Sequence, residues 1–143
     1  MADAFYDEGR NGMLGGGVHD QPDLNTNDIR VGLRDEGTTA INLATQIDLA
    51  DVVAAFVGSH TALAGLTVGS AGVGAFDHAD ETYPTLAGAT VESLDYFDYQ
   101  TAADASSPMI CNLDSWTGLP LTPNGGDVIL SPAAGGVFSI PAA

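Results

Sequence analysis

The side chains best suited to bind a metal ion gather within residues 77–81. Asp77, His78, Asp80 and Glu81 offer one imidazole and three carboxylates, and alternating acids in a loop can bind Ca²⁺. Their spacing differs from that of an EF-hand, which sets its ligands around a glycine and ends on a glutamate. Zinc would require more histidine or cysteine. We therefore expect a solvated acidic loop that binds cations non-specifically, with a specific metal site at these four residues as the weaker alternative.

Residues that could act as nucleophiles or general bases show no catalytic arrangement in the sequence. Ser59 and His60 are neighbours along the chain, whereas the members of a catalytic triad are assembled across a fold. The glycine-rich run 69–74 lacks the order of a phosphate-binding loop. With 19 acidic residues, pairs of carboxylates are unavoidable and do not indicate sugar hydrolysis. We predict neither an enzyme nor a bound cofactor, with a cation-dependent hydrolase as a remote alternative.

The charge balance is the most unusual property of the composition. The chain has a formal net charge of −16, with 19 acids, three arginines and no lysine. Such a surface repels phosphate, which excludes nucleic acid as a partner and disfavours anionic membranes. Hydrophobic residues make up 45% of the chain, so it can form a core despite its charge. Because about 1 M salt shortens the Debye length to about 3 Å and screens self-repulsion, we predict a halophilic source.

The length of 143 residues suits a single domain, which we predict to span 1–143. A chain of this size can fold without a disulfide or a metal, and its one cysteine, Cys111, lies in an apolar run that predicts a buried side chain. Acids near the start do not fit a signal peptide, and no apolar run reaches the length of a membrane span. We expect a soluble protein that is made in the cytoplasm and has no membrane partner.

Residues 1–17 are predicted to form a helix or arm that precedes a β domain over 18–143. Apolar side chains including Phe5 and Tyr6 recur with helical spacing over 2–14, and three successive glycines then end the pattern. Acids near the start favour the amino end of a helix. This helix either packs on its own domain or docks on a neighbouring subunit.

The clearest strand pattern begins at Ile29. Ile29, Val31 and Leu33 alternate with Arg30 and Arg34, so the apolar residues share one face and the arginines the other. We expect both arginines to face outward and to neutralise nearby aspartates. Recognition of an acidic partner surface is the second interpretation.

Further strands are predicted where β-branched and aromatic residues lie between glycines and prolines. The expected ranges are 62–64, 66–68, 73–76, 82–87, 91–100, 109–113, 128–130 and 137–140. Residues 91–100 are predicted to form a central strand, and 82–87 an edge strand or a strand that starts at Pro84. Residues 48–53 are predicted to form a short helix capped by Asp48. Many short strands with such turns predict a mainly β fold, a small single-domain sandwich or barrel with a short N-terminal helix.

A rigid loop over 117–127 joins two of these strands. Its two prolines each fix a backbone angle, and Asn124-Gly125 tolerates the positive φ of a tight turn. Trp116, the only tryptophan, lies beside this loop. We predict that it anchors the loop by packing, with a hot spot at a subunit interface as the alternative.

Two segments together resemble one known family. Residues 4–14, AFYDEGRNGML, followed by TNDIRVGL at 26–33, resemble an opening of the form ALYDKGREGFL…TDDIRVAL. Residues 117–127, TGLPLTPNGGD, resemble TGLPVTPNGGD. Both are similar to small virion structural proteins of long-tailed viruses. The resemblance does not cover 38–90, and the end of the chain departs from the family's NGANKIFKL-like strand.

The resemblance implies a capsid decoration or cement protein that stabilises the head without catalysis. It implies that the protein lies on the capsid surface of the virion, bound to the outside of the major capsid protein lattice and to sister copies in a trimer or pentamer. A tail or neck component is the alternative, and the missing lysines fit a haloarchaeal virus. The residues predicted to contact the shell or sister copies are Phe5, Tyr6, Arg10, Arg30, Arg34, Trp116 and Leu119.

Overall fold

The computed structural model describes residues 3–19, 22–70, 72 and 74–139. It has one short α-helix, and its ten strands form three antiparallel sheets that do not close into a barrel within these ranges. The elements are β1 (Ala4–Phe5), α1 (Asp7–Met13), β2 (Ile29–Arg34), β3 (Thr61–Ala62), β4 (Thr67–Val68), β5 (Ala75–Asp77), β6 (Glu81–Tyr83), β7 (Ser93–Asp98), β8 (Met109–Leu113), β9 (Val128–Leu130) and β10 (Phe138–Ser139). The predicted mainly β class is confirmed, and the layers fit a sandwich.

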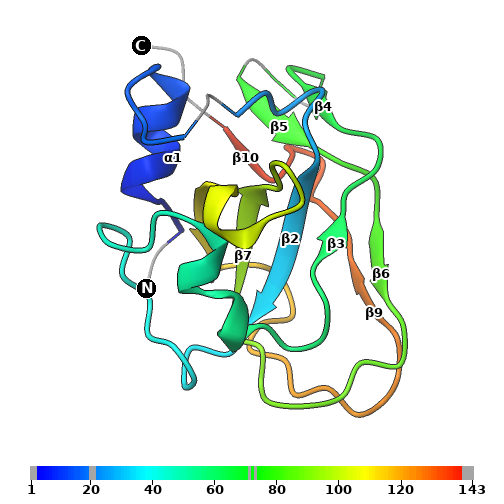
Figure 1. The fold of residues 1–143 in the computed structure, drawn as a ribbon. Coiled ribbons are helices and arrows are strands. Elements are labelled where there is room, and N and C mark those ends of the chain that lie inside the picture. Colours follow the sequence, from blue (N-terminus) through cyan, green and yellow to red (C-terminus); the bar gives the residue numbers. More distant parts are fainter. Residues whose placement is uncertain (1–2, 20–21, 71, 73, 140–143) are drawn as a thin grey trace.

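The largest sheet has five strands in the order β1-β8-β7-β2-β3 (Figure 1). Its centre is the pairing of β2 with β7, which runs without interruption from Ile29 opposite Asp98 to Arg34 opposite Ser93. β7 is flanked by β8 and β2, as expected of the central strand predicted over 91–100. Both strands are buried along nearly their whole length, because layers cover both faces of this sheet.

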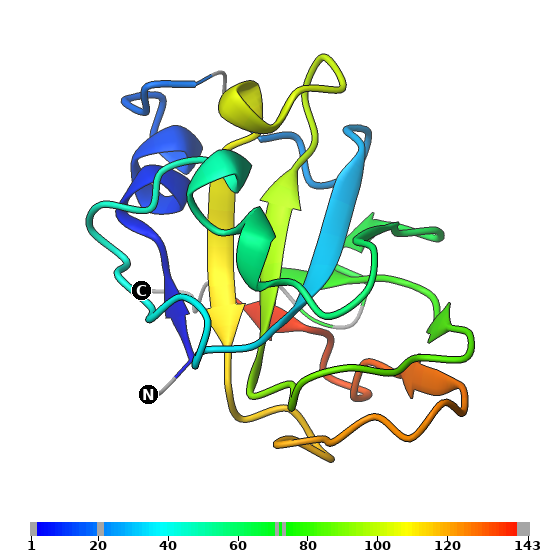
Figure 2. The same cartoon turned by 60° about the horizontal axis from the view of Figure 1, so that its bottom comes forward.

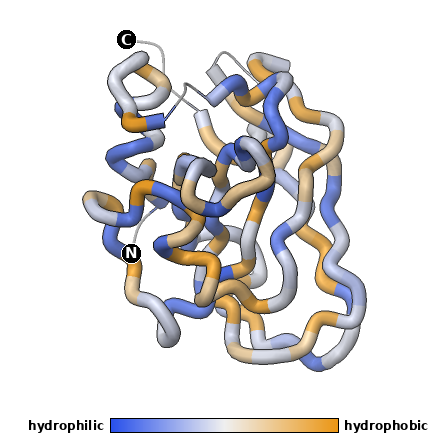
Figure 3. Tube along the Cα trace, viewed as in Figure 1, coloured by the Kyte–Doolittle hydropathy of each residue, from blue (hydrophilic) through white to orange (hydrophobic). Residues whose placement is uncertain are grey.

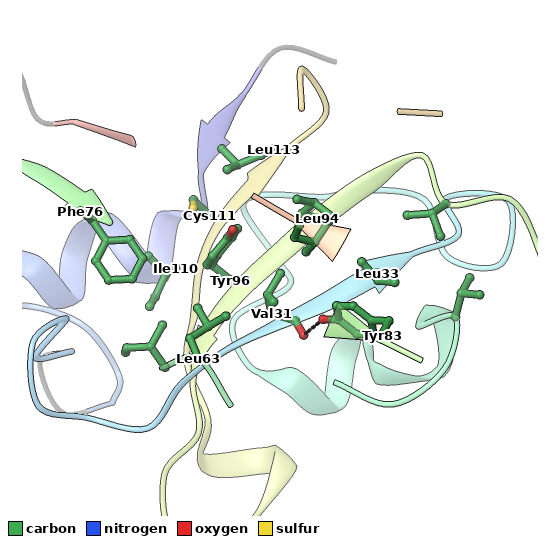
Figure 4. Close-up of a cluster of buried hydrophobic side chains, with 14 of the residues drawn as sticks. Val31, Leu33, Leu63, Phe76, Tyr83, Leu94, Tyr96, Ile110, Cys111 and Leu113 are labelled. Carbon is green, nitrogen blue, oxygen red and sulfur yellow. Dashed lines mark hydrogen bonds between the residues drawn. The ribbon is translucent and has the colours of Figure 1, made fainter. Parts of the chain in front are cut away.

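The main core lies between one face of this sheet and the two smaller sheets, β10-β5-β4 and β6-β9. Figure 4 shows Val31, Leu94 and Tyr96 of the large sheet within this core. Tyr83 of β6 crosses the layers, and its hydroxyl donates to the Val31 carbonyl oxygen at 2.8 Å. The predicted burial of Cys111 is confirmed, and burial raises the pKa of its thiol well above the usual value.

The opposite face of the large sheet is covered by the segment that carries 3₁₀ helices at Leu49–Asp51 and Val53–Ala55 (Figure 1), while α1 packs beside β8. A second, smaller core lies there. Gly32 of β2 makes this packing possible, because a Cβ at that position would lie 2.3 Å from two ring carbons of Phe56. The predicted cap is also present: Asp48 accepts a hydrogen bond from the Ala50 N–H at 3.1 Å.

The N-terminal helix is shorter than the sequence predicts. Residues Ala4–Phe5 form β1 on the edge of the large sheet, and the Tyr6 N–H donates to the Ile110 carbonyl oxygen at 3.0 Å. The helix begins only at Asp7, because pairing with β8 holds the preceding backbone extended. It packs on its own domain, which is the first of the two predicted arrangements.

The predicted strand over 82–87 is wrong in its extent. β6 ends at Tyr83, directly before Pro84, and Thr85 then has a φ of 49° that takes the chain out of the sheet. Proline therefore ends this strand and does not start it. Positions 2, 73 and 140 of other predicted ranges lie outside the described residues. In the described ranges, no helix is both long enough and apolar enough to cross a lipid bilayer.

Candidate functional site

The structure separates the four residues that were the candidates for a metal site. His78 points into the core, where its Nδ1 donates to the Ala79 carbonyl oxygen at 2.6 Å and its Nε2 lies 3.1 Å from the Tyr96 hydroxyl. Asp80 faces solvent and Asp77 accepts from the His78 backbone N–H. No group of three or more ligand side chains within residues 3–19, 22–70, 72 and 74–139 is placed to hold a metal. Burial lowers the pKa of His78, so the neutral ring fits this position.

The other two histidines, His60 and His19, also contact side chains of their own fold. The ring of His60 packs edge-on against Phe97 at 5.3 Å between centroids, and its Nδ1 lies 3.4 Å from Arg30 Nη1. Burial, and then the charge of Arg30, lower the pKa of His60. His19 Nε2 lies 4.0 Å from an Asp48 carboxylate oxygen. Neither side chain has a described hydrogen bond to a serine or cysteine, so neither is arranged to activate a nucleophile.

Arg34 corrects the expectation that both arginines of β2 face outward. It is fully buried, and its Nη1 donates to Asp95 Oδ2 at 2.9 Å and to the Tyr6 hydroxyl at 2.8 Å. Its Nη2 donates to the Thr39 carbonyl oxygen at 2.9 Å. The alternation along β2 was correctly inferred, but the second face of the sheet is covered by protein instead of water. Tyr6 and Arg34 are therefore inaccessible to a partner, contrary to the predicted contact set.

Each arginine pairs with an aspartate, and for Arg30 and Arg34 this agrees with the first of the two interpretations. Arg10 lies on the surface and contacts Asp7. Arg30 Nη2 donates to Asp28 Oδ2 at 2.7 Å, and its guanidinium carbon lies 3.9 Å above the centre of the Tyr99 ring. The hydrogen bonds that Arg30 donates to Asp28 raise the pKa of the Arg30 guanidinium. With 19 acids against three arginines, most of the negative charge of the chain stays uncompensated.

Charged residues are distributed unevenly along the chain: residues 52–76 contain no acid and no arginine, and two further segments that lie together in the fold are nearly free of them. Residues 82–91 contain no charged residue, and 115–139 contain only Asp127. We call these two segments the acid-poor layer. Residues 82–91 and 115–130 lie together along the bottom of Figure 2, where the pairs Ala87–Asn124 and Val91–Leu121 link them as isolated bridges, whereas the end of the second segment pairs with β5 as β10. Figure 3 shows the same loops mostly in white and orange, whereas α1 is largely blue.

The acid-poor layer contains a hollow of about 400 Å³ beside Trp116. Its lining includes Leu113, Thr117 and Val137, and we call it the Trp116 hollow. Trp116 and Leu119 are half-buried and pack against the main core, which agrees with the predicted role of Trp116 as an anchor of its loop.

The N-terminal segment is tied to the same hollow. Asp3 accepts hydrogen bonds from the backbone N–H groups of Asp114 at 3.0 Å and Ser115 at 2.9 Å. Burial acts to raise the pKa of Asp3, but the hydrogen bonds from Ser115 and Asp114 outweigh it and lower the pKa. Phe5 packs edge-on against Phe138, with 5.0 Å between ring centroids. The N-terminal segment therefore contacts the chain on both sides of the acid-poor layer's central loop, at 114–115 and at Phe138.

Among the residues predicted to make contacts, the structure leaves Phe5, Arg10, Arg30, Trp116 and Leu119 at least partly accessible. Sequence reasoning missed the acid-poor layer, although the run of neutral residues over 115–126 was a visible signal. Comparison with models of known protein families finds no match, and a search of curated proteins also finds none.

Proposed function

We propose that this chain is a capsid decoration or cement protein, which binds the outside of the major capsid lattice of a tailed virus. The observation that carries the proposal is the acid-poor layer: in a chain with a net charge of −16, the segments 82–91 and 115–139 lie together and contain one acid between them. A surface with so few acids can meet another protein without strong electrostatic repulsion. The resemblance of 4–14, 26–33 and 117–127 to virion proteins supports the same role.

The Trp116 hollow is the proposed contact with the capsid. Its lining combines apolar and hydroxyl side chains with one carboxylate, that of Asp3, which is already hydrogen-bonded to Ser115, and it offers room for a protruding side chain of the partner. Apolar burial contributes about 25 cal/mol per Å² before the costs of association. Many copies bound across the seams of one lattice then stabilise the head together, even where each single contact is weak. This role involves no catalysis.

Binding to purified heads tests the proposal. Heads stripped of the protein are incubated with wild-type chain in multimolar salt and sedimented, and the bound copies are counted by quantitative mass spectrometry. We expect saturation at a fixed high copy number, and heads that resist heating better once loaded. A few copies per particle would identify a tail or neck component instead, and no binding would refute a role in the virion.

A matched pair of variants locates the contact. Thr117→Glu places a carboxylate at the Trp116 hollow, whereas Thr45→Glu places the same group on the exposed segment across the large sheet. Both side chains lie at the surface, so both variants should fold with unchanged circular dichroism. We expect Thr117→Glu to weaken binding to heads about tenfold or more and Thr45→Glu to leave it unchanged. Equal effects of the two variants would exclude the hollow as the contact.

A further inference from the structure

His60 and Arg30 meet near the edge of the large sheet, in a contact that only a neutral imidazole can make. Arg30 Nη1 lies 3.4 Å from His60 Nδ1. The nitrogens of a guanidinium donate hydrogen bonds and cannot accept them, so Nδ1 is the acceptor and the ring carries its proton on Nε2. A proton on Nδ1 would set two donors and two positive charges against each other. The contact therefore depends on the protonation state of His60.

Arg30 cannot withdraw from a protonated ring without losing its other partners. Its Nε and Nη2 both donate to the Asp28 carboxylate, at 3.1 and 2.7 Å. Its guanidinium carbon lies 3.9 Å above the centre of the Tyr99 ring. Asp28 and Tyr99 thus fix the position of the guanidinium, and its Nη1 faces His60.

Aromatic neighbours confine the ring of His60 in the same way. Its centroid lies 5.3 Å from the ring centroid of Phe97, 5.2 Å from that of Tyr99 and 6.4 Å from that of Phe56. Phe97 belongs to β7, Tyr99 directly follows β7, and Phe56 directly follows the 3₁₀ helix Val53–Ala55. A ring enclosed by these side chains cannot turn its charge toward water when it is protonated.

The titratable and charged groups that face the ring among the described residues are Arg30, Asp28, Asp104 and Tyr99. Burial lowers the pKa of His60 most, and the positive charge of Arg30 lowers it further. Asp104 and Asp28 attract an imidazolium and act to raise the pKa, but the first two causes outweigh them. The folded chain therefore binds this proton less readily than a chain in which the ring is free in water.

The edge strand β3 begins directly after this contact. β3 lies beside β2 at the edge of the large sheet and pairs with it over two residues (Figure 1). The N–H groups of Val57 and Leu63 donate to carbonyl oxygens of β2 at 2.7 and 2.9 Å. These bonds hold segment 57–63 on β2. So short an edge opens at a much lower free energy than the whole domain unfolds.

We infer that His60 is a pH-sensitive contact, which holds segment 57–63 on β2 while its ring is neutral and releases the segment when the ring is protonated. The segment is fully held above about pH 6.5, the ordinary pKa of histidine, and its hold weakens as the pH falls below this value. Opening then increases by up to about tenfold per pH unit, until the closed form also binds the proton. The inference concerns the isolated chain and does not depend on the proposed function.

Hydrogen exchange of the full chain between about pH 5 and about pH 8 in multimolar salt tests this inference. Protection of the amides in 57–63 is compared with that of β7, after correction for the intrinsic pH dependence of exchange. His60→Gln keeps a neutral acceptor that cannot be protonated in this range, and His19→Gln is the matched control at a histidine beside Asp48. From about pH 7.5 to about pH 5, we expect protection of 57–63 to fall about tenfold or more in the wild type and in His19→Gln. It should stay level in His60→Gln, and β7 should stay protected in all three proteins.

NMR titration of the His60 ring gives an independent measurement on the wild-type chain. We expect its pKa to lie below about 6.5, and Arg30→Gln to raise it, because the repelling charge is then absent. A ring that titrates at or above the ordinary value overturns the inference, even where His60→Gln does not fold. Equal loss of protection in the wild type and in His60→Gln also overturns it. A loss that extends equally over β7 does the same, because it indicates global unfolding.

Discussion

Arg34 and Asp95 form an ion pair from which solvent is fully excluded, with both side chains at 0% exposure. Asp95 also accepts hydrogen bonds from the Tyr6 hydroxyl at 2.7 Å and from Asn112 Nδ2 at 2.8 Å. These bonds hold β2, β7, β8 and the start of α1 together at one point. The buried Asp95 carboxylate keeps its cation and its hydrogen bonds only while Arg34, Tyr6 and Asn112 are all present. Removal of one of them is costly, because a buried charge without a partner is strongly destabilising.

We therefore predict that Arg34→Met lowers the free energy of unfolding by about 3–5 kcal/mol, since it leaves the Asp95 carboxylate buried without its cation. Denaturant unfolding followed by tryptophan fluorescence measures the change. Arg10→Met is the control, because it removes an arginine of the same chain from an exposed pair with Asp7 and should change stability little. Equal effects of both substitutions would contradict the structural role of Arg34.

At the scale of the elements, Gly9 sets how closely α1 approaches β8. A Cβ at this position would lie 2.3 Å from the Ile110 carbonyl oxygen, well inside van der Waals contact. Alanine favours helices over glycine by about 1 kcal/mol, so helix propensity alone predicts that Gly9→Ala stabilises the protein. We predict the reverse, a loss of about 1–3 kcal/mol, because the helix must move off the sheet.

Thermal melting of Gly9→Ala and of Asn11→Ala separates the gain in helix propensity from the loss of close packing against β8, within one helix. Asn11 is exposed, so its replacement changes helix propensity without touching β8. We expect Asn11→Ala to melt at or slightly above the wild-type temperature and Gly9→Ala clearly below it. A Gly9→Ala variant as stable as the wild type would mean that α1 does not pack as closely as the structure has it.

These elements also show how far the sequence alone could lead. The alternation in β2 and the apolar runs at β7, β8 and β9 were sufficient to locate the strands, because each is a local pattern. The helix start at Asp7 could not be predicted, since it depends on pairing between β1 and β8 more than 100 residues apart in the chain. The burial of Arg34 likewise could not be predicted, because it depends on which segment of the chain covers the second face of the sheet.

Local sequence signals located some residues of the candidate site and missed others. Trp116 and Leu119 could be selected because large apolar residues beside a rigid loop seldom face water on all sides. The candidate metal ligands Asp77, His78, Asp80 and Glu81 were grouped because they are close in the sequence. Neighbouring side chains of an extended segment point in opposite directions, so closeness in the sequence does not bring such ligands together. The acid-poor layer required the fold, because its two segments lie apart in the sequence and are joined by the pairing of β6 with β9 and by the bridges Ala87–Asn124 and Val91–Leu121.

At the scale of the whole molecule, uneven charge predicts a strong dependence of stability on salt. The three arginines are all paired with aspartates, so the other carboxylates repel one another over the surface outside the acid-poor layer. We expect the melting temperature to rise steeply in KCl up to about 1 M, where the Debye length is about 3 Å, and more slowly above it. Strengthened apolar burial alone would produce an even rise at all concentrations.

Asp80→Asn removes one exposed carboxylate near Asp77 and Glu81 and should raise the melting temperature in dilute buffer while leaving it unchanged in high salt. A melting temperature that is indifferent to salt would refute both the repulsion and the halophilic origin inferred from it.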